Sequence, residues 1–391
     1  MKLRSFMLAL VLTGCTVTLF AQKSELNSAK SNYEKFASLK EMGTIALGAT
    51  NLKSARASID KAAVHEKTQN DPSTWAYKAL IYSSLALLDS VPAKSEPLYT
   101  ESASALEKAI SLDKDGANKT QIEGTKVNIA QYHMNTGVKA YQASKFADAY
   151  KAFNNSLTYR PGDTTITYYA GLSAVNAKDY KSAIKSYQSL VKENFSANNR
   201  VYLDLSKLYA LERDTASAIR IATEGATKFP GDAELATQEI ELHLLTGKQK
   251  EIIGKIAEQS KKQPTNKLYP FYLGIAYASS NDPVKAEEAY KQAIAIDPAF
   301  TDATINLGGL ILNKGIDIYN AASKLPQNEQ KKYDEMLKKA TAEFDRAFPY
   351  LQKATELNPK SRMAWENLKT YYLVKRNEAK VTEITKTINS L

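Results

Sequence analysis

The sequence has very few of the side chains that bind metals or attack substrates. It holds 391 residues but only one cysteine, Cys15, and three histidines. Cys15 lies in a segment with the pattern of an export leader. If the leader is removed, the mature chain has no cysteine, and it can form no disulfide, thiol nucleophile or thiolate metal site. No two of His65, His133 and His243 are close enough for a zinc-binding spacing. We therefore expect no metal and no cofactor, and we expect His133 and His243 to be packed side chains.

Catalytic motifs are also missing. Thr246-Gly247-Lys248 resembles the end of a phosphate-binding loop, but no glycine stands five residues before Gly247. We expect Gly247 to serve instead in a turn between two helices, where the backbone requires glycine. There is no Gly-x-Ser-x-Gly motif and no pair of carboxylates that the expected fold would place in a cleft. The sequence predicts a protein that is not an enzyme.

Long apolar runs, strand patterns and charge clusters are absent as well. Beyond the leader, no run reaches the roughly 18 apolar residues that a membrane-spanning helix needs. No stretch alternates polar and apolar residues for long enough to predict a sheet, so the expected fold class is all-α. The formal net charge is +10, and removal of the leader's two basic residues lowers it to +8. The lysines are dispersed, which favours a solvated helical surface over a nucleic-acid-binding patch.

The N-terminus has the pattern of a secretory signal peptide. Lys2 and Arg4 precede a short apolar core, and Ala21 is a suitable small residue before a cut. Residues 1–21 are then the signal peptide, and the mature chain, 22–391, is exported to the periplasm. The alternative is lipidation, because Leu12-Thr13-Gly14-Cys15 resembles a bacterial lipobox; the signal would then end before Cys15. The segment that would follow Cys15 is apolar, whereas lipoprotein tethers are usually polar. We expect a membrane as a partner only if Cys15 is lipidated.

Proline recurs at a regular interval along the chain. Pro230, Pro264 and Pro298 are evenly spaced, Pro161 stands almost two intervals before Pro230, and Phe195 occupies the position one interval after Pro161. Proline ends helices, because it lacks an N–H group and clashes with the preceding turn. The interval is about 34 residues, a period that predicts a chain of stacked helix-turn-helix units.

Small residues recur with the same period. One series is Gly137, Gly171, Ser206, Ile240, Gly274 and Gly308. Twelve residues after each stand Ala149, Ala183, Ala218, Ile252, Ala286 and, after an insertion, Ala347. Sixteen residues after each of the first five stand Phe153, Tyr187, Ala222, Ile256 and Tyr290. Small residues are expected where two helices cross closely, with a larger side chain filling the space beside them.

This pattern resembles the tetratricopeptide repeat (TPR) family. The best-matching unit runs from Leu273-Gly274-Ile275-Ala276-Tyr277 through Ala286 and Tyr290 to Asp297-Pro298. The resemblance covers essentially all of residues 22–391. It implies a right-handed superhelical solenoid of about nine helix pairs. Ile240 and Ile252 depart from the family pattern because they are bulkier.

Two intervals are longer than one period. The interval from Gly308 to Lys369 is nearly twice one period, which predicts an inserted helical arm at about 313–341, made by one lengthened helical hairpin. The interval from Ala79 to Gly137 is also too long, and Val91-Pro92 is one expected interruption. Insertions in solenoids are often placed on one face and used for binding.

The resemblance implies that the first helix of each unit lines an inner, concave wall. The inward positions named as partner-binding are Met134, Tyr141, Tyr168, Leu172, Leu203, Leu211, Leu268, Phe271 and Ile275. Most are apolar or aromatic, so we expect a groove that binds an extended or helical segment of another protein. Phe271 is expected to anchor a partner with little role in stability.

The main hypothesis is a non-catalytic scaffold or adaptor of the bacterial cell envelope, with a protein as partner and neither nucleic acid nor metal. A first alternative keeps the fold but anchors it through Cys15, as an accessory lipoprotein of an envelope assembly machine. A second alternative is a carbohydrate-binding component of a nutrient-uptake system, suggested by the 23 tyrosines. Tyr187 and Tyr290 have a simpler explanation as side chains that fill the repeats.

Overall fold

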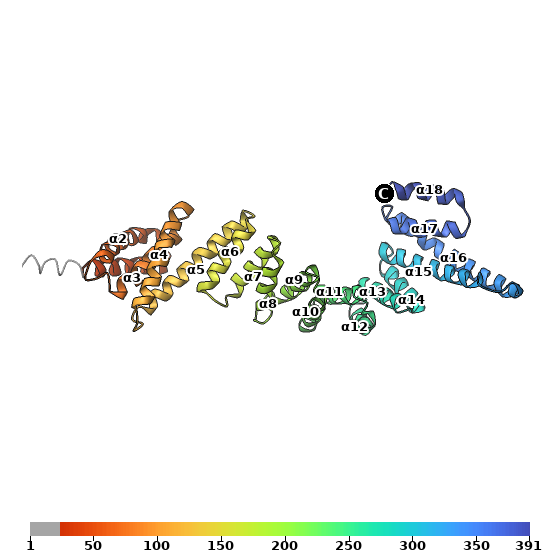
Figure 1. Ribbon diagram of the computed structural model, residues 1–391, viewed down its shortest axis with the longest axis horizontal. Coiled ribbons are helices and arrows are strands. Elements are labelled where there is room, and N and C mark those ends of the chain that lie inside the picture. Colours follow the sequence, from red (N-terminus) through yellow and green to blue (C-terminus); the bar gives the residue numbers. More distant parts are fainter. Residues whose placement is uncertain (1–23) are drawn as a thin grey trace, which may run out of the picture. The chain divides into compact units, whose positions relative to one another are not determined.

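The computed structural model describes residues 24–391, and in them every regular element is a helix (Figure 1). The all-α prediction is therefore confirmed. The expected cleavage after Ala21 and the lipidation at Cys15 lie outside the described residues. The chain forms two compact units, with the division between Leu208 and Tyr209.

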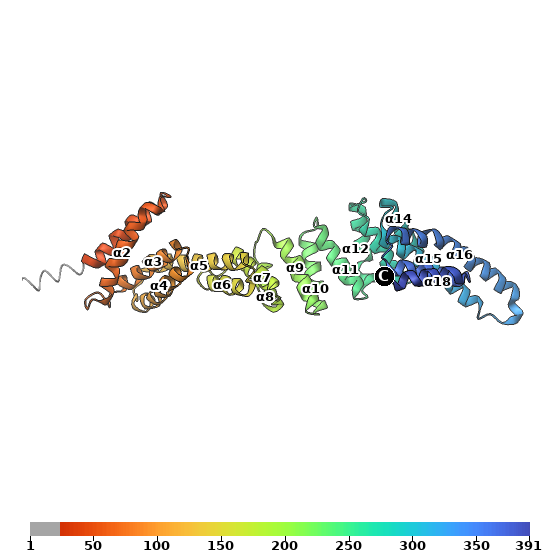
Figure 2. The ribbon, with the colours of Figure 1, turned by 90° about the horizontal axis from the view of Figure 1, so that it is seen from above.

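The described helices follow one another as nine pairs, as expected from the repeats. The first helices of the pairs are 24–41, α3 (Pro72–Leu88), α5 (Lys119–Gln142), α7 (Thr164–Asn176), α9 (Asn198–Leu211), α11 (Ala233–Leu245), α13 (Leu268–Ser279), α15 (Thr301–Ala322) and α17 (Arg362–Val374). The second helices are α2 (Ile45–Val64), α4 (Pro92–Leu112), α6 (Phe146–Tyr159), α8 (Tyr180–Leu190), α10 (Thr215–Lys228), α12 (Gln249–Lys262), α14 (Pro283–Ile296), α16 (Gln330–Leu357) and α18 (Glu378–Asn389). Within each unit, helices pack mainly on their neighbours in the chain (Figure 2).

One residue with a positive φ angle makes the turn inside most of the pairs. These residues are Gly43, Ser144, Lys178, Arg213, Gly247, Asn281 and Arg376, with φ between 56° and 75°. Gly247 thus occupies the turn expected for it, and it adopts this φ without the strain that a side chain adds. Aspartates then cap the following helices: Asp179 accepts from the N–H of Ser182, and Asp282 accepts from the N–H of Lys285, both at 3.2 Å.

The small residues of the repeats make room for a large side chain of the same pair. A Cβ atom at Gly171 would lie 2.3 Å from Cε1 of Tyr187, which is too close for any real contact. The same construction at Gly137 meets the ring of Phe153 at 2.7 Å. Tyr187 and Phe153 are both fully buried. The sequence spacing of sixteen residues therefore describes a direct contact between the first and second helices.

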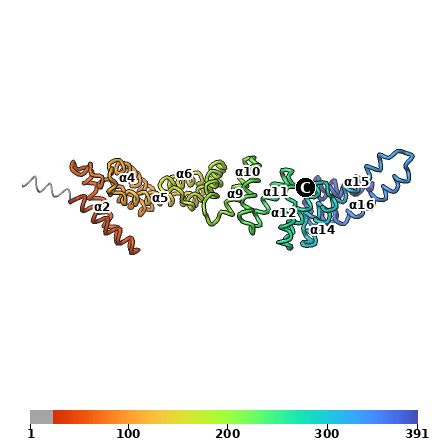
Figure 3. The backbone as a smooth tube through the Cα atoms, turned by 90° about the horizontal axis from the view of Figure 1, so that it is seen from below, coloured from red at the N-terminus to blue at the C-terminus, as the bar shows by residue number. Residues whose placement is uncertain are grey.

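The longest hairpin consists of α15 and α16, with 22 and 28 residues. A short 3-10 helix, η1 (Gln327–Glu329), precedes α16. The end of the hairpin that carries η1 projects beyond the other helices of its unit in all three views (Figures 1, 2 and 3). Along the hairpin, a Cβ at Gly315 would lie 2.6 Å from the ring of Phe344, so the close glycine-to-ring packing extends outside the repeat pattern.

Candidate functional site

Four of the five predicted inner-face residues of the first unit lie on the first helices α5 and α7. Met134, Tyr141, Tyr168 and Leu172 are all half-buried. The ring of Tyr168 lies 5.4 Å from that of Phe195 and 6.2 Å from that of Tyr187. Because the side chains are only half covered, each combines packing against its own repeat with an exposed apolar surface.

Leu203 is a correction. The sequence places it at an inward, partner-binding position, but only 3% of its surface is exposed. Helix α9 is covered on several sides, since Val201, Tyr202 and Leu205 are buried at least as completely as Leu203. Repeat spacing gives the angular position of a residue on its helix but not how far the neighbouring helices cover it. Leu203 therefore belongs to the core.

The predicted residues of the second unit differ in their exposure. Leu211 is 61% exposed, whereas Leu268, Phe271 and Ile275 on α13 are half-buried. The ring of Phe271 lies 5.0 Å from that of Phe300 and also packs on the buried residues around it. Phe271 is thus part of the packing as well as of the surface, in contrast to the purely binding role expected from the sequence.

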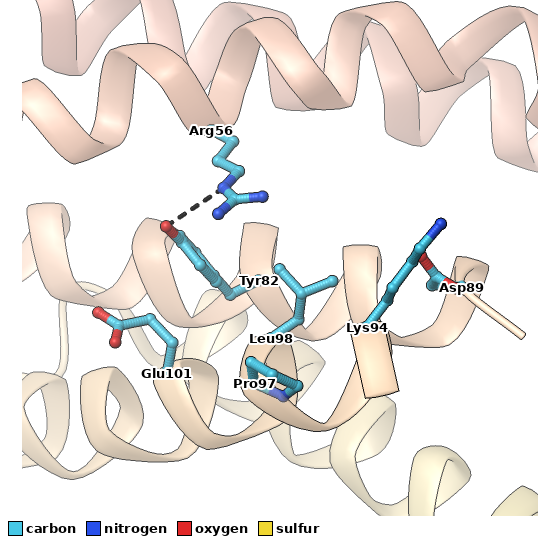
Figure 4. Close-up of a pocket in the computed structure, with 7 residues that line it drawn as sticks. All are labelled: Arg56, Tyr82, Asp89, Lys94, Pro97, Leu98 and Glu101. Atoms are coloured by element: carbon cyan, nitrogen blue, oxygen red, sulfur yellow. Dashed lines mark hydrogen bonds between the residues drawn. The ribbon is translucent and has the colours of Figure 1, made fainter. Parts of the chain in front are cut away.

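A polar pocket lies between α2, α3 and α4, in the first unit (Figure 4). Its volume is about 470 Å³, and it is open to solvent rather than enclosed. It is lined by Arg56, Tyr82, Asp89, Lys94, Pro97, Leu98 and Glu101. None of these residues was named from the sequence as a binding residue.

A network of polar side chains holds Arg56 in this pocket. Its Nε donates to the Tyr82 hydroxyl at 3.3 Å (Figure 4). The hydroxyl in turn donates to Asp60 Oδ1 at 2.7 Å. The guanidinium carbon lies 5.1 Å from the centre of the Tyr82 ring, a cation–π distance. Burial of the phenol, followed by its hydrogen bond to Asp60, raises the pKa of Tyr82 to about 12. Tyr82 therefore stays protonated at neutral pH and keeps donating to Asp60.

Lys78 connects this network to the wall of the pocket. Its ammonium group lies 2.7 Å from Glu101 Oε1 and 3.8 Å from Asp60 Oδ1, and only 12% of its side chain is exposed. The same group lies 5.5 Å from the centre of the Tyr82 ring. Its partners are more open, with 41% of the Asp60 side chain and 44% of the Glu101 side chain exposed, so salt screens these pairs in part. Lys78 thus joins Glu101 in the pocket wall to Asp60 in the network.

The sequence contained one signal for this pocket. The interval from Ala79 to Gly137 is longer than one repeat, which predicts an interruption around Val91-Pro92. In the structure this segment joins α3 to a long α4, and α4 supplies Lys94, Pro97 and Leu98 to the pocket. The length of the interval was visible, but the side chains that it brings together were not.

The histidine at 133 is packed, as expected from the sequence. It lies among the rings of Tyr99, Tyr132 and Tyr159, and its Nε2 is 3.0 Å from the Tyr99 hydroxyl. Burial lowers the pKa of His133 to about 4, so it is neutral at physiological pH. Among residues 24–391, no group of three or more potential ligands is arranged to hold a metal ion. In the same residues, no helix combines the length and apolarity needed to cross a bilayer.

The stacked helix pairs define the class of the protein, which is an all-α helical-repeat protein. Two tetratricopeptide repeat profiles match the sequence: one covers residues 271–300, and the other covers 134–198 and 170–233. The matched residues are tetratricopeptide repeats, which agrees with the resemblance read from the sequence. Such repeats are in general non-catalytic modules for protein–protein interaction. No curated protein sequence matches the chain significantly.

Solved structures of other TPR proteins resemble this chain. A TPR repeats protein from Bacteroides fragilis NCTC 9343 is 26% identical, with 63% of this chain and 98% of that one covered and a TM-score of 0.33. The C-terminal part of a TPR repeat-containing protein from Cytophaga hutchinsonii is 16% identical, with coverages of 66% and 95% and a TM-score of 0.44. YrrB, described as a TPR protein with an unusual peptide-binding site, is 19% identical, with coverages of 51% and 95% and a TM-score of 0.38.

Proposed function

We propose that this chain is an exported, non-catalytic scaffold of the bacterial cell envelope, and that its first helices bind an extended or helical segment of a partner protein. The observation that carries the proposal is the half-buried apolar surface on successive first helices. In the first unit it consists of Met134 and Tyr141 on α5, with Tyr168 and Leu172 on α7. Repeated apolar side chains at this spacing suit a partner that presents apolar side chains in a row.

Two contacts support a continuous surface from α5 to α7. Asn176 Nδ2 donates to the Tyr141 hydroxyl at 3.1 Å, so the two first helices are joined at this surface. Tyr141 also lies 5.3 Å from Phe146, ring centre to ring centre, at the start of α6. The Tyr141 ring is thus held in place before a partner arrives, which lowers the entropy lost on binding. Binding to an apolar surface should depend only weakly on salt, in contrast to recognition by charges.

Photocrosslinking in living cells tests this surface. A photoreactive amino acid replaces Tyr141 in the first unit or Ile275 in the second, and captured proteins are identified by mass spectrometry. Matched controls are Lys151 on α6 and Val284 on α14, which are exposed and lie on second helices. We expect one protein to be captured from the inner positions and not from the controls. Equal capture at the controls, or none at any position, would show that the first helices are not the binding surface.

The export part of the proposal has its own test. Cell fractionation should place the chain in the periplasm, and the mass of the mature protein should correspond to cleavage after Ala21. Labelling with a fatty-acid analogue should give no signal, for the wild type as for Cys15→Ala. A lipid signal that Cys15→Ala abolishes would instead establish the membrane-anchored alternative.

A further inference from the structure

The pocket between α2, α3 and α4 is separate from the surface of the first helices. Two of its three walls, α2 and α4, are second helices of their pairs. Both helices are long, with 20 residues in α2 and 21 in α4, where α6 has 14. The added residues of α4 include Lys94, Pro97 and Leu98, so an insertion into the repeat supplies part of the pocket.

Arg56 presents unused hydrogen-bond donors to this pocket. Its Nε donates to Tyr82 and lies 3.8 Å from Asp60 Oδ2, whereas its two terminal NH₂ groups make no hydrogen bond to any residue of 24–391. The guanidinium extends from α2 toward Tyr82 and Leu98 (Figure 4). Because the Tyr82 ring and hydroxyl hold the guanidinium, its two terminal NH₂ groups form a fork that is already oriented before a ligand binds. Such a fork matches the two oxygens of a carboxylate.

The rest of the lining limits the charge of a ligand. The acidic residues Glu101 and Asp89 lie at opposite ends of the pocket (Figure 4). Glu101 is paired with Lys78. The lining as a whole carries as many acidic as basic side chains, so a doubly charged phosphate would be repelled more than a single carboxylate. The apolar surfaces of Leu98 and Pro97 beside Arg56 suit an apolar side chain next to that carboxylate.

We infer that this pocket is a second binding site, which takes a carboxylate-bearing peptide segment with its carboxylate on Arg56 and a neighbouring apolar side chain on Leu98. The carboxylate comes either from the C-terminus of a polypeptide or from an acidic side chain. The peptide's N–H groups face the acceptor oxygens of Glu101 and Asp89. This site does not depend on the partner surface of the first helices, and either can exist without the other.

Binding of short peptides to the full mature chain tests the site. The probes are N-acetyl-leucyl-leucine, its C-terminal amide, and N-acetyl-leucyl-aspartyl amide, whose only carboxylate is on the side chain. The readout is the shift of the Leu98 methyl signals in a methyl-labelled NMR sample. We expect at least one of the two acids to bind with a Kd on the order of 1 mM, because it makes one charged contact and buries one apolar group. The leucyl-leucine amide should bind at least about tenfold more weakly. The acid that binds more tightly identifies the source of the carboxylate.

Variants assign the binding to Arg56. Arg56→Gln should weaken the binding of the acid about tenfold, the usual effect of losing a charged hydrogen bond. Arg56→Lys keeps the charge but loses the fork, and it should give an intermediate loss while remaining folded. The control is Lys53→Gln, which removes one exposed positive charge from the same helix and should change affinity by less than about twofold.

Three results would overturn the assignment. The amide could bind as well as the acids, which would show that no carboxylate is recognised. Lys53→Gln could weaken binding as much as Arg56→Gln, which would show general attraction by charge. Inorganic phosphate could displace the acid at equal concentration, which would show an unspecific anion site. None of these results affects crosslinking at Tyr141, so failure of this site and failure of the first-helix surface are distinguishable.

Discussion

Gly171 and Ile240 hold the same position in their repeats, one in the first compact unit and one in the second. The helix pairs pack in opposite ways at these two residues. In the first, a glycine on α7 leaves room for the buried ring of Tyr187 on α8. In the second, Ile240 on α11 faces a core in which Ile252 and Ile256 on α12 replace the small and aromatic residues. Both crossings are fully buried. The comparison teaches that the total volume at the crossing matters more than the identity of any one residue.

The largest effect is expected from a cavity in the isoleucine crossing. Ile256→Ala removes a fully buried side chain and leaves a cavity, so it should destabilise the second unit by about 2–5 kcal/mol. Urea unfolding followed by circular dichroism, with hydrogen exchange of α11 to α13, measures the loss. Val284→Ala is the control, because Val284 is 65% exposed and should change stability by less than about 0.5 kcal/mol. Equal losses for the two variants would mean that Ile256 is not the centre of this crossing.

The second-largest effect is expected from overpacking at Gly171, where α7 crosses α8. Gly171→Ala places a methyl group 2.3 Å from the ring of Tyr187 and should destabilise the first unit by about 1–3 kcal/mol, although alanine favours the helix. The double variant with Tyr187→Leu should lose less than the sum of the two single losses, because the smaller side chain gives the methyl group room. Coupling of about 0.5–3 kcal/mol in a double-mutant cycle would support this account, and simple additivity would contradict it.

A smaller effect concerns the hydroxyl of Tyr187. It is buried without a hydrogen-bond partner among the described residues, so Tyr187→Phe should leave stability unchanged or raise it by about 1 kcal/mol. The contrasting variant is Tyr82→Phe, which removes a hydroxyl bonded to Asp60 and should cost about 1–2 kcal/mol. Thermal unfolding of both variants gives the comparison. A clear loss for Tyr187→Phe would show that its hydroxyl is bonded in solution.

The smallest effect at neutral pH is electrostatic and belongs to the first unit. Burial lowers the pKa of His133 to about 4, against 6.5 for the unperturbed side chain, so the folded state resists protonation. The stability associated with the neutral ring is complete above pH 6.5 and is lost as the pH falls toward 4, because the unfolded chain binds the proton first. His133→Phe should therefore unfold with less dependence on pH between about 7 and 5. An unchanged pH dependence would place the main titrating groups elsewhere.

Much of the fold could be predicted from the sequence, because its packing is local. Glycine and aromatic residues sixteen positions apart meet across one helix pair, as Gly137 and Phe153 do. The turn at Gly247 could likewise be predicted from its position between two helices. The candidate binding residues were harder to predict. Leu203 has the same inward repeat position as the half-buried Met134 and Tyr168, yet α9 buries it, because coverage depends on neighbours that no spacing describes.

The sequence by itself determined the repeated helix pairs, because a regular period of small, large and helix-ending residues allows few other ways to bury apolar surface. Only the tertiary structure decided which side chains are open to a ligand. Arg56, Lys78 and Glu101 stand far apart in the sequence, and they meet because α4 is long enough to continue beside α2 and α3. Ion pairs and pockets of this kind depend on distances across helices, which the order of residues along the chain does not specify.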